Sequence, residues 1–142
     1  MTVAVIDDQL LSKVLRGRRP KALANAELYT TGYWYVRLCQ AVLGAAERTG
    51  VLSTPFAELP TELREQALEA LIELPEQIGL VSLRELAPRI GQLRQRHDLN
   101  ILGMEALAAA DHLGATVVLS VASPRLQASL AAEGLKAKVL RR

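Results

Sequence analysis

Short apolar runs, several of them rich in β-branched residues, alternate along this chain with longer stretches of helical periodicity. This alternation constrains the fold more than any other feature of the sequence. The apolar runs have the length of strands and lie at 3–6, 78–81, 116–119 and 136–140. In the last of them lysines occupy alternate positions, which is typical of an edge strand. We therefore expect an α/β fold in three layers, with a mostly parallel central sheet of about four strands and helices on both faces.

The stretches between these runs carry helix-capping residues and apolar residues at helical spacing. We expect helices at 9–16, 27–47, 61–74, 82–98, 101–113 and 124–133. Two positions are candidate interruptions: Gly32 within the second helix, and Pro88 within the fourth, where we expect a kink or a restart. No internal repeat or flexible linker divides the chain, so we expect a single domain over residues 1–142.

The composition excludes several classes of protein. Half of the 142 residues are apolar and 23% are charged, which excludes intrinsic disorder. Cys39 is the single cysteine, so neither a disulfide framework nor a thiolate zinc site is available. No apolar run approaches the length of a membrane span, and acids at positions 7 and 8 come too early for a signal peptide. We expect a cytoplasmic protein without membrane contact.

Carboxylates are the side chains most able to carry chemistry here. The sequence has only two histidines and none of the common phosphate-loop, nucleophile-elbow or zinc motifs. Ligands of open parallel sheets bind at the carboxyl ends of the strands, so the turns at 7–8 and 120–123 are candidate walls of one cleft. A single acid suffices to cap the first helix. We expect Asp8 to do so and Asp7 to be free for another role.

Glu105 stands on an apolar face of a nearly all-apolar helix. A buried carboxylate is costly unless it is paired, hydrogen-bonded or bound to a metal. Two interpretations remain open from the residues alone. In one, the carboxylate reaches the rim of the protein and meets an arginine. In the other, it lines the cleft and holds a hard cation such as Mg²⁺ or Mn²⁺, which take oxygen ligands.

Three segments together resemble a PIN domain, the fold of the small metal-dependent ribonuclease toxins of toxin–antitoxin pairs. They are V-A-V-I-D, which ends at Asp7, then L-N-I-L-G-M-E-A-L-A-A-A at 99–110, and L-G-A-T-V-V-L-S at 113–120. The resemblance covers the whole chain in length and element order. It implies about four acids at the carboxyl edge of the sheet that hold one or two Mg²⁺ or Mn²⁺ ions.

Two of these four acids have a counterpart in this sequence, and the other two positions hold residues that are not acids. Asp7 matches the first acid, and Glu105 falls on the acid that opens the D-A-L-type helix. Arg37 stands where the family has its second acid. Ala122, two residues after Ser120, stands where the fourth is expected. We expect Asp8, Ser120 and Ala122 to line the cleft, and the Arg37 guanidinium to bind both Asp7 and Glu105 and keep the site free of metal.

A run of cations at the end of the first expected helix and just after it has no intervening acid. Its candidate nucleic-acid contacts are Arg16, Arg18, Arg19 and Lys21. The alternative is that these side chains form a solvated surface.

The function we expect is a PIN-like domain of ribonuclease descent with an incomplete metal site, associated with nucleic acid or with another protein. One alternative is an active Mg²⁺- or Mn²⁺-dependent endoribonuclease toxin with Asp7 and Glu105 as its catalytic metal ligands. Another is a structural interaction module without RNA. The expected partners are RNA, an antitoxin-like protein and, since the family commonly dimerises, a second copy of the chain.

Overall fold

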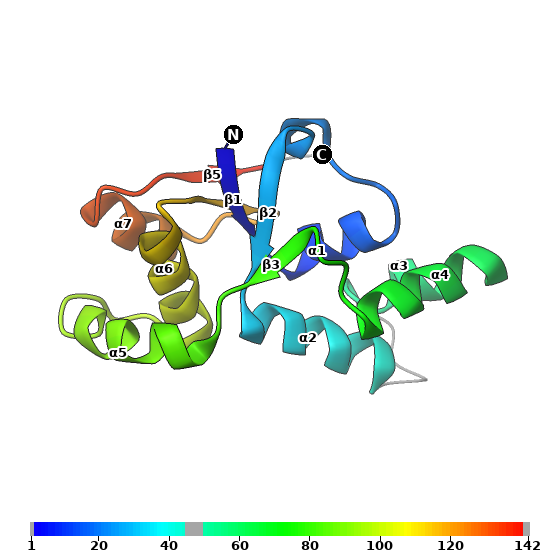
Figure 1. Ribbon diagram of the computed structural model, residues 1–142, viewed down its shortest axis with the longest axis horizontal. Coiled ribbons are helices and arrows are strands. Elements are labelled where there is room, and N and C mark those ends of the chain that lie inside the picture. The colour runs from blue at the N-terminus through cyan, green and yellow to red at the C-terminus, as the bar shows by residue number, and fades with distance from the viewer. Residues whose placement is uncertain (1, 45–49, 141–142) are drawn as a thin grey trace.

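The computed structural model describes residues 2–44 and 50–140, and its central element is a parallel sheet of five strands. The strands lie in the order β3-β2-β1-β4-β5, and every neighbouring pair is parallel (Figure 1). Their bounds are Thr2–Ile6 (β1), Ala26–Thr30 (β2), Ile78–Leu80 (β3), Thr116–Leu119 (β4) and Ala137–Val139 (β5). The expected α/β fold with a parallel sheet is confirmed, with five strands where about four were expected.

Helices cover both faces of the sheet, which completes the three layers. They are α1 (Asp8–Leu15), α2 (Gly32–Leu43), α3 (Thr54–Ala57), α4 (Thr61–Ile72), α5 (Leu83–Leu93), α6 (Ile101–Leu113) and α7 (Pro124–Ala132), with one 3₁₀ turn at Lys21–Leu23. Figure 1 shows α5, α6 and α7 to one side of the sheet and α1, α3 and α4 to the other. No helix in the described ranges has the length and apolar character needed to cross a membrane.

Strand β1 lies at the centre of the sheet and is buried on both faces. Val5 packs into the core on the α5–α7 side, whereas Ala4 and Ile6 pack into the core on the α1–α4 side. Successive side chains of a strand point to opposite faces, so one short apolar run supplies both cores. Helix α2 joins the two cores, since its Trp34 belongs to the first and its Leu38 to the second.

One expected helix is wrong at its beginning, because 26–30 form strand β2. The sequence A-E-L-Y-T contains three residues that favour helices, which is why its local pattern suggests one. Pairing with two neighbours overrides this preference: Leu28 lies beside Ala4 of β1 and beside Ile78 of β3. Gly32 therefore begins α2 instead of interrupting a helix, and α2 ends at Leu43. The expected continuation to position 47 lies largely outside the described residues.

The other expected helices are present, although the one expected at 82–98 ends at Leu93. Helix α5 continues through Pro88 from Leu83 to Leu93. Of the kink or restart expected there, the restart is wrong, although the proline still removes one backbone donor. Asn100 caps α6 by accepting a hydrogen bond from the Gly103 amide, and Gly114 ends that helix in the left-handed conformation. The short helix α3 was not expected from the sequence.

Candidate functional site

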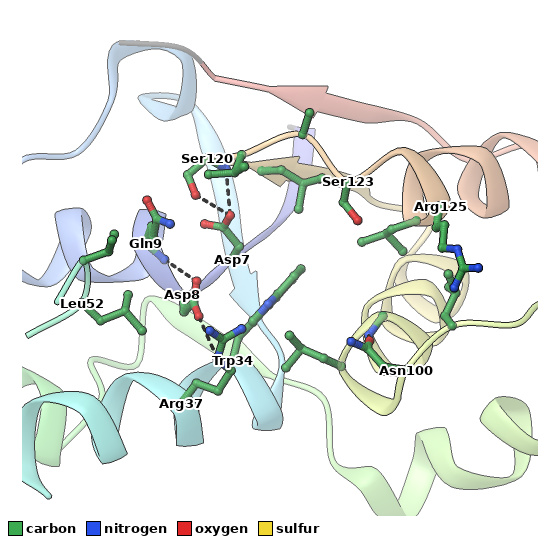
Figure 2. Close-up of a pocket in the computed structure, with 18 residues that line it drawn as sticks. Asp7, Asp8, Gln9, Trp34, Arg37, Leu52, Asn100, Ser120, Ser123 and Arg125 are labelled. Atoms are coloured by element: carbon green, nitrogen blue, oxygen red, sulfur yellow. Dashed lines mark hydrogen bonds and ion pairs between the residues drawn. The ribbon is translucent and has the colours of Figure 1, made fainter.

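A cleft of about 510 Å³ opens at the carboxyl ends of β1 and β4. Part of its polar lining comes from the turns that follow these strands, with Asp7 and Asp8 after β1 and Ser120 after β4. Its apolar lining comes from side chains packed below these turns: Trp34, Leu99, Leu102, Leu119 and Leu126. Figure 2 shows the two aspartates and Ser120 on one side of the cleft, with Trp34 between them and the residues of α6 and α7. The expected placement of the turns 7–8 and 120–123 at one cleft is confirmed.

Asp7 holds the end of β1 to the end of β4. Its Oδ1 accepts a hydrogen bond from the Leu10 amide at 3.0 Å, which caps α1. Its Oδ2 accepts two more, from the Ser120 amide at 2.8 Å and from the Ser120 hydroxyl at 2.7 Å (Figure 2). The expected division of roles between the two acids is therefore wrong. Asp7 still has the extended backbone of a cap, whereas Asp8 is already the first residue of the helix.

Asp8 faces the guanidinium of Arg37 within the cleft. The Arg37 Nε lies 3.5 Å from the Asp8 Oδ2, and the Asp8 Oδ1 accepts a hydrogen bond from the Gln9 amide. Burial raises the pKa of the Asp8 carboxyl, Arg37 opposes this rise, and the neighbouring Asp7 adds to it. The Arg37 side chain is 55% exposed, so it is accessible to solvent or to a ligand.

Glu105 is completely buried and caps a helix other than its own. Its Oε2 accepts a hydrogen bond from the Gly32 amide at 3.0 Å, and its Oε1 accepts one from the Tyr33 amide at 2.8 Å. These are the first two amides of α2, and Thr31 accepts from the third, that of Trp34. The positive end of the α2 dipole thus stabilises the buried carboxylate.

The expectation that the Arg37 guanidinium binds both Asp7 and Glu105 is wrong. Arg37 lies on α2 and pairs with Asp8, while Glu105 is held by the amides of the same helix and is not among the residues that line the cleft. The physical reason is local: the amides at the start of α2 already satisfy both Glu105 oxygens, so no arginine is needed there.

The donor set does not fit Mg²⁺ or Mn²⁺. Three hydrogen bonds occupy the Asp7 oxygens, backbone amides occupy both Glu105 oxygens, and Asp8 is paired with a cation. Ala122 lines the cleft, as expected, but brings no side-chain oxygen. Within residues 2–44 and 50–140, no three histidine, cysteine, aspartate or glutamate side chains come together as a metal site. A divalent ion needs several free oxygen ligands, and this cleft does not offer them.

The four cations singled out in the sequence do not form one surface. Arg19 is structural, since its guanidinium donates to the carbonyl oxygens of Leu23 and Ala26 and so closes the loop before β2. Lys21 lines a separate pocket near the amino ends of the strands, at the opposite end of the sheet from the cleft. Arg16 and Arg18 line a groove beside α1. The structure therefore separates a run that is continuous in the sequence.

The cleft also contains Arg125, a cation that the sequence analysis missed. Arg125 is exposed at the start of α7 and has no ion-pair partner in the described part of the chain. Figure 2 shows it on the side of the cleft away from Asp8, near Asn100. Its position directly after the Ser-Pro helix start that follows β4 is the signal by which it could have been found.

Neither the protein-family models nor the curated proteins compared with this chain give a match.

Proposed function

We propose that this chain is a PIN-like domain of ribonuclease descent whose metal-binding acids have taken structural roles, and that its cleft binds single-stranded nucleic acid without cleaving it. The resemblance of three sequence segments to PIN domains supports the descent. The observation that carries the loss of cleavage is the environment of Glu105, whose two oxygens are both occupied by the amides of Gly32 and Tyr33. Glu105 is also completely buried and does not line the cleft, so an ion in the cleft does not reach its oxygens.

The lining of the cleft supports nucleic acid as its ligand. Arg37 and Arg125 provide exposed guanidinium groups, which bind phosphate through charge-assisted hydrogen bonds. Between them the cleft is lined by Leu102, which is half-buried, and by Trp34 and Leu99, which belong to the core and are only 5% and 8% exposed. This part of the cleft is therefore apolar, and it can contact a base but offers no open ring for stacking. A single strand offers both of these chemical groups, whereas a duplex hides its bases inside the stack. The cleft also has the volume of a typical small-ligand site, at about 510 Å³.

The proposal is tested with fluorescently labelled single-stranded RNA of about 16 nucleotides, in fluorescence anisotropy titrations and cleavage assays. We expect binding whose dissociation constant rises steeply between about 50 and about 200 mM salt, because phosphate contacts release counterions. Arg125→Ala is expected to weaken binding about tenfold, equivalent to about 1.4 kcal/mol. The matched control is Arg84→Ala, which removes an exposed arginine from α5 outside the cleft and should leave the affinity unchanged. With Mg²⁺ or Mn²⁺ added, the RNA should remain intact.

Two outcomes would overturn this proposal. Metal-dependent cleavage that disappears in Asp7→Asn would establish an active endoribonuclease, with Asp7 as a metal ligand after all. Absence of RNA binding at any salt concentration would leave a protein-interaction module, for which the antitoxin-like partner and the homodimer suggested by the family resemblance are the first candidates to test.

A further inference from the structure

A second cavity with a strongly cationic lining lies beside the carboxyl half of α1. This groove has a volume of about 660 Å³. Three of its lining residues are cations, Lys13, Arg16 and Arg18, and one, Glu58, is an acid. The Arg16 guanidinium is steadied by a hydrogen bond from its Nε to the Ser12 hydroxyl. The groove therefore presents net positive charge to solvent, and the function proposed above does not use it.

The cleft and this groove share both of their side walls. On α1, Gln9 lines the cleft, while Lys13 and Arg16 line the groove. These residues are four and three positions apart, so they lie on one face of the helix, along about 10 Å of its axis. The segment 51–60 also lines both cavities: its Leu52 lines the cleft, and its Pro55 lines the groove. In both segments the lower-numbered residues line the cleft and the higher-numbered residues line the groove.

We infer that α1 and the segment 51–60 are the two sides of a path along which a single RNA strand held in the cleft continues into the cationic groove. This inference rests on the proposed function and names a second binding site for the same ligand. In the groove, Lys13 and Arg18 contact phosphates of the strand.

The test measures how affinity depends on the length of the RNA, with single strands from about 4 to about 16 nucleotides. A strand that fills only the cleft should bind the wild-type protein weakly, and affinity should rise once the strand reaches the groove. In the double variant Lys13→Ala/Arg18→Ala, the shortest strands should bind as they do to the wild type. The longest should bind about tenfold more weakly, and the slope of log K against log salt should fall by about 1.4, at about 0.7 per lost phosphate contact.

Two further variants make the test specific. Lys21→Ala/Lys138→Ala removes the same charge from the pocket near the amino ends of the strands and should change neither the length dependence nor the salt slope. Glu58→Gln removes the acid from the groove and should tighten the binding of long strands only. A length dependence that survives in Lys13→Ala/Arg18→Ala, or an equal loss for short and long strands, would overturn the path. Absence of binding by the wild type at every length would instead overturn the proposed function, and the path with it.

Discussion

Glu105 illustrates how a single residue can keep a charge in an apolar environment without a cation. A buried carboxylate loses its hydration, and ordinarily a metal ion or an arginine compensates for that loss. Here the compensation comes from two backbone amides and the dipole of α2, supplied by residues more than seventy positions earlier in the chain. Gly32 belongs to the same arrangement, because a Cβ atom at this position would lie 3.1 Å from the Glu105 Oε2. The close approach of the carboxylate therefore favours glycine at the start of α2.

The residue-scale prediction concerns stability. Glu105→Ala should lower the free energy of unfolding by about 2 to 4 kcal/mol, because it leaves two helix-start amides without acceptors and opens a cavity. Glu105→Gln should cost about 1 to 3 kcal/mol, since an amide keeps only one acceptor and lacks the charge. Urea denaturation measures both. Glu69→Gln, an exposed change on α4, serves as the control and should stay within about 0.5 kcal/mol of wild type. A Glu105→Gln variant as stable as the control would contradict the capping role.

At the scale of elements, the carboxyl end of α7 is fastened to the segment that follows α5. Glu133 is the C-cap of α7, where the helix dipole disfavours an acid. Both Glu133 oxygens accept hydrogen bonds from Arg96, at 3.1 and 2.9 Å, and the His97 Nε2 lies 2.6 Å from one of them. These hydrogen bonds, first from Arg96 and then from His97, lower the pKa of the Glu133 carboxyl to about 2. The ionised carboxylate is thus preferred in the folded state.

This pKa determines how the contribution of the contact depends on pH. The folded value of about 2 lies below the ordinary value of 4.5, so the folded state holds this proton less strongly than the unfolded state. The stabilisation is therefore complete above about pH 4.5 and is lost as the pH falls toward about 2. The free energy of unfolding of wild type should exceed that of Glu133→Gln at neutral pH, and the difference should shrink through this range. The difference should be moderate, because half of the Arg96 side chain is exposed. A difference independent of pH would show that Glu133 acts by packing instead of by charge.

At the scale of the whole molecule, the order of the strands creates the cleft. Strand β1 lies between β2 and β4, so the turn after β1 meets the turn after β4, and the amide of Asp7 donates to Val118 across this junction. Asp7 and Ser120 are 113 residues apart in the sequence but share two hydrogen bonds. The start of α2 approaches the same edge and brings Arg37 to Asp8. A guanidinium thus faces Asp8, at the sequence position for which the family resemblance predicts an acid.

The whole-molecule prediction is that this cleft responds to Mn²⁺ only when the charge of Arg37 is reversed. Thermal unfolding of the wild type should show the same midpoint with millimolar MnCl₂ as with KCl of equal ionic strength. Arg37→Glu places a carboxylate opposite that of Asp8, so it should melt at a lower temperature without metal. The two facing carboxylates should then bind Mn²⁺, which stabilises the variant by about 2.7 kcal/mol at a hundredfold excess over its dissociation constant. Arg84→Glu makes the same charge change on α5 and should not respond. A saturable rise in the wild-type midpoint would show that the native cleft binds the ion.

Features that depend on neighbouring residues were predictable from the sequence. The apolar runs at 3–6 and 116–119 form strands, and the helix expected at 101–113 has those bounds. They depend on side-chain periodicity, capping and backbone conformation, which act over a few residues. The parallel sheet was predictable from the alternation of strands and helices, because strands joined through helices align in one direction. The parallel arrangement also predicted that the turns 7–8 and 120–123 lie at one cleft.

The tertiary structure decided whatever depends on partners distant in the chain. Residues 26–30 became a strand because β1 and β3 flank them, against their own preference for a helix. The sequence showed that Glu105 needed compensation, but it did not show that the amides of α2 would provide it or that Arg37 would pair with Asp8 instead. The physical reason is the same in each case. A hydrogen bond or an ion pair depends on distances of a few ångströms, and for residues far apart in sequence the packing of the whole chain sets those distances.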